Sequence, residues 1–222
     1  MQYNFDEVID RKNTNAVKLE RCKALFGTED VLPLWVADMD FRTPDFILDA
    51  LRQRLEHPIL GYTMPPANFY PLMQQWITAH HNWNVKREWI GFLPGIVPGL
   101  AFAVQCLTEV GDEIIVQPPV YYPFFNVVKN NNRTLVYNPL IEKDGKFVMD
   151  FEDLETKFSS KTKLFILCNP HNPGGRVWMH EELQQLADIC EKHNVTIVSD
   201  EIHADMVLPG NTRHTPMACV SE

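Results

Sequence analysis

The sequence lacks the cysteine spacing of a disulfide framework or a zinc site. Its five cysteines are odd in number and far apart, and no two form a Cys-x-x-Cys pair. Small secreted domains depend on paired cysteines, and structural zinc sites use closely spaced ones. We therefore expect no structural disulfide, no metal site and a reducing compartment, the cytoplasm.

Long apolar segments and an excess of basic residues are also missing. No stretch approaches the roughly 18 uninterrupted apolar residues of a membrane helix, and the first residues, MQYNFDEVIDRK, do not read as a secretion signal. Lys and Arg number 20 against 29 Asp and Glu, which gives a net charge of −9. Because nucleic-acid-binding proteins concentrate positive charge on one face, we expect neither a nucleic acid nor a membrane as partner.

What the sequence does contain is an alternation of helical and strand-like segments. With 222 residues and 45% hydrophobic residues, the chain is large enough for a sizeable core. We predict strands at 113–117, 133–138, 163–168 and 195–199, and a short extended piece at 34–37. Helices are predicted at 14–26, from Thr43-Pro44 onward, and at 67–81, 99–109, 122–131, 150–158 and 180–193. This pattern predicts an α/β fold, a three-layer sandwich with a mainly parallel sheet.

Polar and aromatic residues follow the predicted strands, where ligands bind in sheets of this kind. Asp200 comes directly after the last predicted strand, and Asn172 lies in the loop CNPHNPGGR between two prolines. A carboxylate favours a protonated pyridine nitrogen, an amide can donate to a phenolate oxygen, and a tyrosine such as Tyr121 can stack on a ring. The glycine of Gly95-Ile96-Val97, before a helix, suits a phosphate. Together they fit a flat, phosphorylated nitrogen heterocycle.

Each of these features taken alone has a simpler interpretation. Asn-Pro and Pro-Gly pairs commonly mark turns, and the segment GIVPG does not match the dinucleotide fingerprint G-x-G-x-x-G. Asp200 can serve as a cap or an ion-pair partner, Tyr121 as core or surface filler, and His203 as a structural histidine. The functional interpretation rests on their order and their placement at strand ends.

Six segments in the same order resemble a known family. They are WVADMDF (35–41), HPILGYT (57–63), GIVP (95–98), PVYYPFF (119–125), NPHNPGGRVW (169–178) and SDEIH (199–203). The chain resembles the N-terminal part of a fold-type I pyridoxal 5′-phosphate (PLP) enzyme of the aminotransferase class I/II superfamily. The resemblance is strongest to its cystathionine β-lyase or cystalysin-like C–S lyase branch.

The resemblance implies a role for each candidate site residue. Asp200 would pair with the pyridine nitrogen of PLP and Asn172 with its 3′ oxygen, while Tyr121 stacks on the ring. Ile96 and Val97 would bind the phosphate through their backbone. Further implied positions are His203 beside the cofactor, where many aminotransferases carry tyrosine, Trp35 and Asp38 at the substrate entrance, and Tyr62 at the phosphate of a neighbouring subunit. A homodimer with shared active sites acting on a small amino acid is therefore expected.

The chain departs from the family pattern in one respect. The lysine that forms the Schiff base should follow Asp200 by a few tens of residues, but no lysine follows Lys192. We therefore interpret the chain as part of a longer enzyme, with residues 1–45 as an N-terminal arm and 46–222 as an incomplete PLP-binding domain. The expected parent reaction is α,β-elimination of cystathionine or cysteine to pyruvate, ammonia and a thiol. An aminotransferase and a non-catalytic or regulatory protein are the alternatives.

Overall fold

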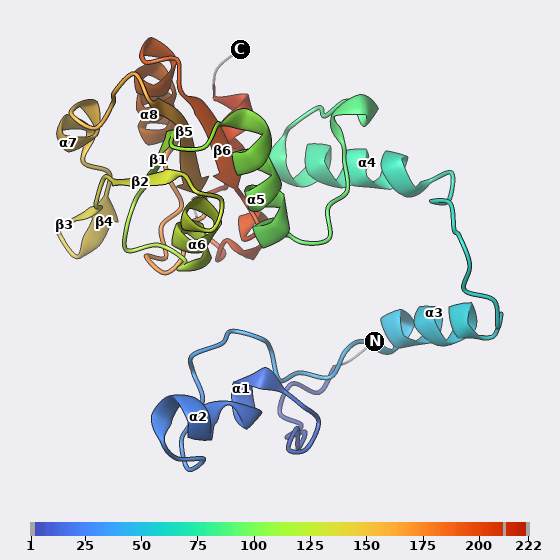
Figure 1. Cartoon of the computed structure of the whole chain (residues 1–222). Helices are drawn as coiled ribbons and strands as arrows, with labels where there is room; N and C mark the ends of the chain where they lie inside the picture. The colour runs from blue at the N-terminus through green and yellow to red at the C-terminus, as the bar shows by residue number, and fades with distance from the viewer. Residues whose placement is uncertain (1–2, 211, 221–222) are drawn as a thin grey trace. The chain divides into compact units, whose positions relative to one another are not determined.

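The computed structural model describes residues 3–210 and 212–220, which form two compact units (Figure 1). The first unit comprises Met1–Met64 and the second comprises Pro65–Glu222. The expected division into an arm up to residue 45 and a domain from residue 46 stays a prediction.

The first unit is largely irregular and contains three helices within its described residues: α1 (Val17–Glu20), α2 (Cys22–Phe26) and α3 (Asp45–Leu55). The single helix predicted over 14–26 is thus two short ones, separated at Arg21. The extended piece expected at 34–37 forms no strand. The helix predicted from Thr43-Pro44 onward is α3, which begins after Pro44 without a side-chain cap.

A four-stranded parallel sheet organises the second unit. Its order is β2 (Thr134–Tyr137), β1 (Glu113–Val116), β5 (Thr162–Cys168) and β6 (Thr196–Asp200). Neighbouring strands pair in parallel throughout, and Cys168 at the end of β5 lies opposite Asp200 at the end of β6. The predicted strand positions are confirmed to within two residues, and so is the mainly parallel sheet.

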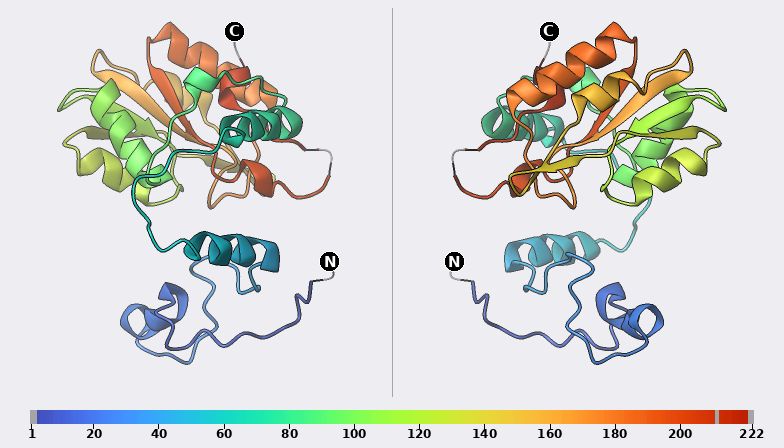
Figure 2. Two further views of the ribbon diagram at one scale, coloured as in Figure 1. Left: turned by 90° about the vertical axis from the view of Figure 1, so that its right-hand side faces the viewer. Right: turned by 90° about the vertical axis from the view of Figure 1, so that its left-hand side faces the viewer.

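Helices cover both faces of this sheet, as the three-layer prediction requires (Figures 1 and 2). Successive residues of a strand point to opposite faces. Phe165 and Leu167 of β5 accordingly join a cluster with α8 (His180–Lys192), which we call the α8-side cluster. Leu164, Ile166 and Cys168 join residues of α5 (Ile96–Leu107) and α6 (Pro123–Lys129) in the α5-side cluster. Both faces of the sheet are therefore apolar and covered.

The remaining elements surround the sheet. A hairpin of β3 (Ile141–Lys143) and β4 (Lys146–Val148) turns at Asp144-Gly145, where both residues have positive φ, and α7 (Phe151–Glu155) follows it. Helix α4 (Phe69–His81) precedes the sheet in the chain. The 3₁₀ turns are η1 (Arg87–Trp89), η2 (Ala204–Met206) and η3 (Met217–Cys219). Among the described residues, none of the helices has the length and hydropathy needed to span a membrane.

Candidate functional site

Asp200 stands at the carboxyl end of β6, next to the end of β5. Along β6, Ile197 packs against the α8-side cluster and Val198 against the α5-side cluster. Alternation along the strand therefore directs Asp200 to the α5 side of the sheet. The residue is 6% exposed, and its Oδ1 accepts a hydrogen bond of 3.1 Å from the backbone N–H of Ile202.

The charge environment of Asp200 favours its neutral form. Burial raises the pKa of this carboxyl above its usual value; the Ile202 N–H and the nearby His203 act in the opposite direction, while Glu201 adds to the increase. No lysine or arginine among the described residues forms an ion pair with Asp200. A buried carboxylate costs free energy unless it is paired, so this position suits a ligand that brings a cationic N–H.

The backbone brings Tyr121 and Asn172 together. The N–H of Tyr121 donates to the C=O of Asn172 at 3.0 Å, and the N–H of Asn172 donates to Sγ of Cys168 at 3.3 Å. Asn172 is half-buried and Tyr121 is 38% exposed, and neither side chain has a recorded hydrogen bond within the described part of the chain. Two predicted site residues from different loops therefore lie side by side, with polar atoms available.

The third predicted part of the site is the beginning of α5. Gly95 precedes the helix with φ of +152°, and Ile96 and Val97 form its first turn, three residues earlier than predicted. Val97 packs against the α5-side cluster, which also contains Cys168. The expected helix start at residue 99 is therefore wrong, and the free N–H groups of the helix belong to the residues predicted to bind phosphate.

His203 follows the strand end and precedes η2. Its side chain is half-buried and lies close enough to Asp200 to lower the pKa of that carboxyl. The structure thus brings His203 to Asp200, although its expected role beside a cofactor stays a prediction.

The other three predicted residues belong to the first unit. The indole N–H of Trp35 donates to the C=O of Lys18 at 3.0 Å, and Asp38 accepts from Arg11 at 2.6 Å. Tyr62 is fully exposed near the end of this unit. Trp35 and Asp38 therefore hold the fold of the first unit together, and their roles toward a substrate, like that of Tyr62 toward a partner subunit, stay predictions.

Sequence reasoning missed the residues that shape the Asn172 loop. His171 is 4% exposed, and its Nδ1 accepts from the N–H of Gly174 at 3.2 Å. A Cβ at Gly174 would lie 2.7 Å from that nitrogen. Trp178 is 1% exposed and donates its indole N–H to the C=O of Cys168 at 2.9 Å. The sequence did offer a signal for this support, because the histidine His171 and the bulky Trp178 stand in or beside a loop of prolines and glycines.

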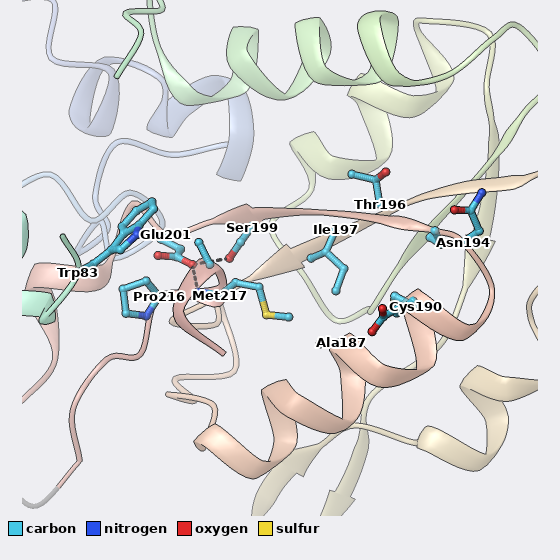
Figure 3. Close-up of a pocket in the computed structure, with 13 residues that line it drawn as sticks. Trp83, Ala187, Cys190, Asn194, Thr196, Ile197, Ser199, Glu201, Pro216 and Met217 are labelled. Atoms are coloured by element: carbon cyan, nitrogen blue, oxygen red, sulfur yellow. Dashed lines mark hydrogen bonds between the residues drawn. The ribbon is translucent and has the colours of Figure 1, made fainter. Parts of the chain in front are cut away.

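A cavity of about 660 Å³ lies beside β6 but on its other face (Figure 3). Its lining includes Ile197, Ser199 and Glu201 of the β6 segment, together with Cys190 of α8 and Met217. Asp200 points to the opposite side of the strand and does not line it. This cavity is therefore separate from the predicted cofactor site.

The geometry agrees with the comparisons with known proteins. The family model for aminotransferase class I and II matches residues 29–220. The chain belongs to this family. One curated relative is cystathionine beta-lyase PatB of Bacillus subtilis, 51% identical over 220 residues. That alignment covers 99% of this chain and 57% of the relative.

Solved structures of this family carry the same fold. Cystalysin from Treponema denticola, described as containing a pyridoxal 5′-phosphate cofactor, aligns with a TM-score of 0.93 and 37% identity, covering 100% of this chain and 57% of that one. A PLP-bound C–S lyase from Staphylococcus hominis aligns with a TM-score of 0.90 and 38% identity, covering 99% and 56%. The expected PLP-transferase fold and C–S lyase branch are confirmed, and the chain spans a little over half the length of these relatives.

The residues present fit a PLP group. The buried Asp200 carboxylate without a lysine or arginine partner suits a pyridinium, and the side-chain amide of Asn172 is available for a phenolate oxygen. The first turn of α5 offers N–H groups. No group of three or more His, Cys, Asp or Glu side chains among residues 3–210 and 212–220 is arranged to hold a metal ion.

Proposed function

We propose that this chain is the PLP-binding part of a carbon–sulfur β-lyase. The proposed reaction is α,β-elimination of an amino acid such as cystathionine or cysteine, with pyruvate, ammonia and a thiol as products. Two findings support it: the site fits PLP, and relatives with the same fold include a cystathionine β-lyase and a C–S lyase. The whole reaction is proposed for a polypeptide that also includes the part of the relatives that this chain does not cover.

The observation that carries the proposal is the environment of Asp200. Its carboxylate is buried and its pKa is raised, and among the residues that the structure describes it accepts one hydrogen bond, from the N–H of Ile202. A protonated pyridine nitrogen would supply the missing cationic partner, and a hydrogen bond to a charged group is worth about 1.5–3 kcal/mol. When bound, PLP withdraws electrons from the Cα of an amino acid through its protonated ring. Asp200 keeps that ring protonated.

The other residues would bind and orient the group. Tyr121 would stack on the ring face, and Asn172, fixed by its backbone contacts to Tyr121 and Cys168, would donate to the phenolate oxygen. The N–H groups of Ile96 and Val97 would bind the phosphate, with the helix dipole in their favour. His203 would lie beside Asp200.

The first unit would contribute from a second subunit. Tyr62 is fully exposed, which leaves its hydroxyl available to the phosphate of a partner's cofactor in a homodimer. Trp35 and Asp38 would line the substrate entrance. The lysine that forms the Schiff base is expected outside these 222 residues.

Binding of PLP to the chain tests the site directly. We would titrate PLP into the 222-residue protein and follow tryptophan fluorescence. We expect Asp200→Asn to weaken binding at least about tenfold, because it removes a charge-assisted hydrogen bond. Asp188→Asn is the matched control, since Asp188 is an exposed carboxylate on α8 that contacts Gln184. Equal affinities of the wild type and the Asp200 variant would contradict the proposed site.

The aminotransferase alternative has support in the family model itself. Both reactions begin with removal of the Cα proton and differ in the next bond to change. The lyase releases a thiol from the β-carbon, whereas the transferase passes the amino group to a keto acid. Thiol and pyruvate measured together decide between them in a polypeptide that includes the remaining part. Amino transfer that depends on a keto acid, without thiol release, would exclude the lyase.

A further inference from the structure

Glu201, the residue after Asp200, accepts three hydrogen bonds from three different places. Its Oε1 accepts from the hydroxyl of Ser199 at 2.8 Å and from the N–H of Met217 at 2.8 Å (Figure 3). Its Oε2 lies 2.9 Å from Nε2 of His214. Glu201 therefore connects the end of β6 to residues 214–217, which are far from it in the sequence.

A second link reaches the same segment from β5. The side-chain Nδ2 of Asn169 donates to the C=O of Thr215 at 3.0 Å, and the backbone N–H of Asn169 donates to the C=O of Asp200 at 3.0 Å. Asn169 is fully buried. Residues 214–217 are thus attached on both sides of Asp200, through Asn169 on the β5 side and Glu201 on the chain itself.

The partner of Glu201 is itself fixed. The His214 side chain is 2% exposed, and its ring lies edge-on to that of His81 on α4, with centroids 5.3 Å apart. A ring that is buried in a closely packed interior has little space in which to change its rotamer. His214 therefore presents Nε2 to Glu201 from a rigid position.

Asp200 depends on this arrangement because its own side chain has little support. Within residues 3–210 and 212–220, its carboxylate accepts one hydrogen bond, from the N–H of Ile202 two residues along the same turn. A carboxylate held by its own turn points where the backbone of that turn directs it. The backbone between Asp200 and Ile202 is the backbone of Glu201.

We infer that Glu201 is a positioning residue that fixes the strand-end turn and so aims the Asp200 carboxylate at the α5 side of the sheet. Successive side chains at the strand end point to opposite faces of the sheet. Asp200 faces the proposed cofactor, and Glu201 faces the opposite side, where it binds Ser199, His214 and Met217. This inference rests on the proposed role of Asp200.

Electrostatics give Glu201 a second effect on Asp200. The charged groups acting on Asp200 are Glu201, which raises the pKa of its carboxyl, and His203, which lowers it; Cys168 lies opposite on β5. A glutamine at 201 keeps one oxygen, which can accept from Ser199 and Met217, but it replaces the other oxygen by an NH2 donor next to His214 and removes the charge. Geometry and charge can therefore be separated by two variants.

The test compares Glu201→Gln with Glu201→Ala in the 222-residue protein without PLP. Hydrogen exchange of the Ile202 amide reports the bond to Asp200, and the amide of Ile115 in β1 serves as the reference for global stability. Carbon NMR of the Asp200 carboxyl gives its titration midpoint. Glu113→Ala is the matched control, because Glu113 accepts from Thr162 and Ser159 at the opposite end of the sheet.

We expect Glu201→Ala to reduce protection of Ile202 at least about tenfold relative to Ile115, since it removes the three hydrogen bonds that hold the turn. Glu201→Gln should retain that protection and move the Asp200 midpoint to lower pH. Glu113→Ala should lower the hydrogen-exchange protection of the Ile202 and Ile115 amides by the same factor. An unchanged ratio of Ile202 to Ile115 in Glu201→Ala would overturn the inference.

Two further outcomes keep the test decisive. If Glu201→Ala does not fold, Glu201→Gln still tests the inference. This variant keeps the oxygen that accepts from Ser199 and Met217, so a loss of Ile202 protection would contradict the inference. An Asp200 titration midpoint that does not move would also contradict it. If wild-type protein protects Ile202 as expected but does not bind PLP, the proposed function fails while the positioning role stands.

Discussion

Replacing His171 by asparagine should make the stability of the second unit less sensitive to acid. The pKa of His171 is lowered from 6.5 to about 4, mainly by burial and in part by the nearby Arg176, while the backbone of Gln117 acts in the opposite direction. The folded protein therefore keeps this ring neutral where the unfolded chain would protonate it. Stability falls as pH drops below 6.5, because the unfolded state then binds more protons.

The magnitude follows from that difference in pKa. At 1.36 kcal/mol per unit, a decrease from 6.5 to about 4 amounts to about 3 kcal/mol when pH is well below both values. At pH 5 the folded ring is still mostly neutral, and the cost is about 2 kcal/mol. This part of the free energy of unfolding is lost as the pH falls from about 6.5 to about 4. It acts on the loop that carries Asn172, so affinity for a cofactor should fall in the same range.

Asparagine is the suitable replacement because its Oδ1 can accept from the N–H of Gly174 as Nδ1 of His171 does. Urea unfolding at pH 7 and pH 5, followed by circular dichroism, gives the free energy of unfolding. Wild-type protein should lose about 2 kcal/mol more than His171→Asn between these values. His180→Asn, at an exposed histidine on α8, is the control. Equal losses in wild type and His171→Asn would refute the reasoning.

Three further variants test the site and its support. Asp200→Asn should raise the melting temperature near neutral pH, because the raised pKa means that the ionised carboxylate destabilises the fold; a lower melting temperature would contradict this. Gly174→Ala should cost about 1–3 kcal/mol by urea unfolding, since its Cβ would lie 2.7 Å from His171, whereas Gly91→Ala has open space and should cost less. Trp178→Phe should cost about 1–3 kcal/mol, because the carbonyl at the end of β5 loses its donor; an unchanged unfolding midpoint would show that this bond is dispensable.

The sheet was predictable because both of its faces are covered. A strand buried on both sides is a short continuous apolar run, such as KLFILC at 163–168, and that run differs from the polar segments around it. The hairpin of β3 and β4 was missed because its strands are largely exposed and only three residues long. Asp144-Gly145 was the signal for it, as Asp-Gly favours the positive φ of a two-residue turn.

The start of α5 shows a different limit. The prediction began the helix at residue 99, because Pro98 and two glycines interrupt the apolar pattern. Proline is tolerated in the first turn of a helix, where no N–H partner is lost. The structure begins the helix at Ile96, which places Pro98 within that first turn. Ile96 and Val97 were assigned to the phosphate from the order of the motifs along the chain. That they are helical depends on packing with other parts of the fold, which the local sequence does not show.

The candidate site was likewise only partly predictable from the sequence. Asp200, Asn172 and Tyr121 could be proposed from sequence because each follows a strand, and parallel strands end at one edge of the sheet. Their direct contacts could not be predicted. The bond from Tyr121 to Asn172 depends on the paths of two loops, and the support of Glu201 depends on residues 214–217, which no local pattern connects to β6.

The sequence Ser-Asp-Glu at the end of β6 illustrates why adjacent acidic residues at a strand end can have separate tasks. The end of β6 is half-buried to buried, so polar side chains there are stabilised by hydrogen-bond partners. Ser199 and Glu201 bind each other on one face. Asp200, on the other face, has no lysine or arginine partner among the residues that the structure describes, and burial raises its pKa. Asp200, which forms no ion pair with a lysine or arginine in the described part of the chain, is therefore the residue suited to bind a cationic ring, and Glu201 is the neighbour proposed to hold it in position.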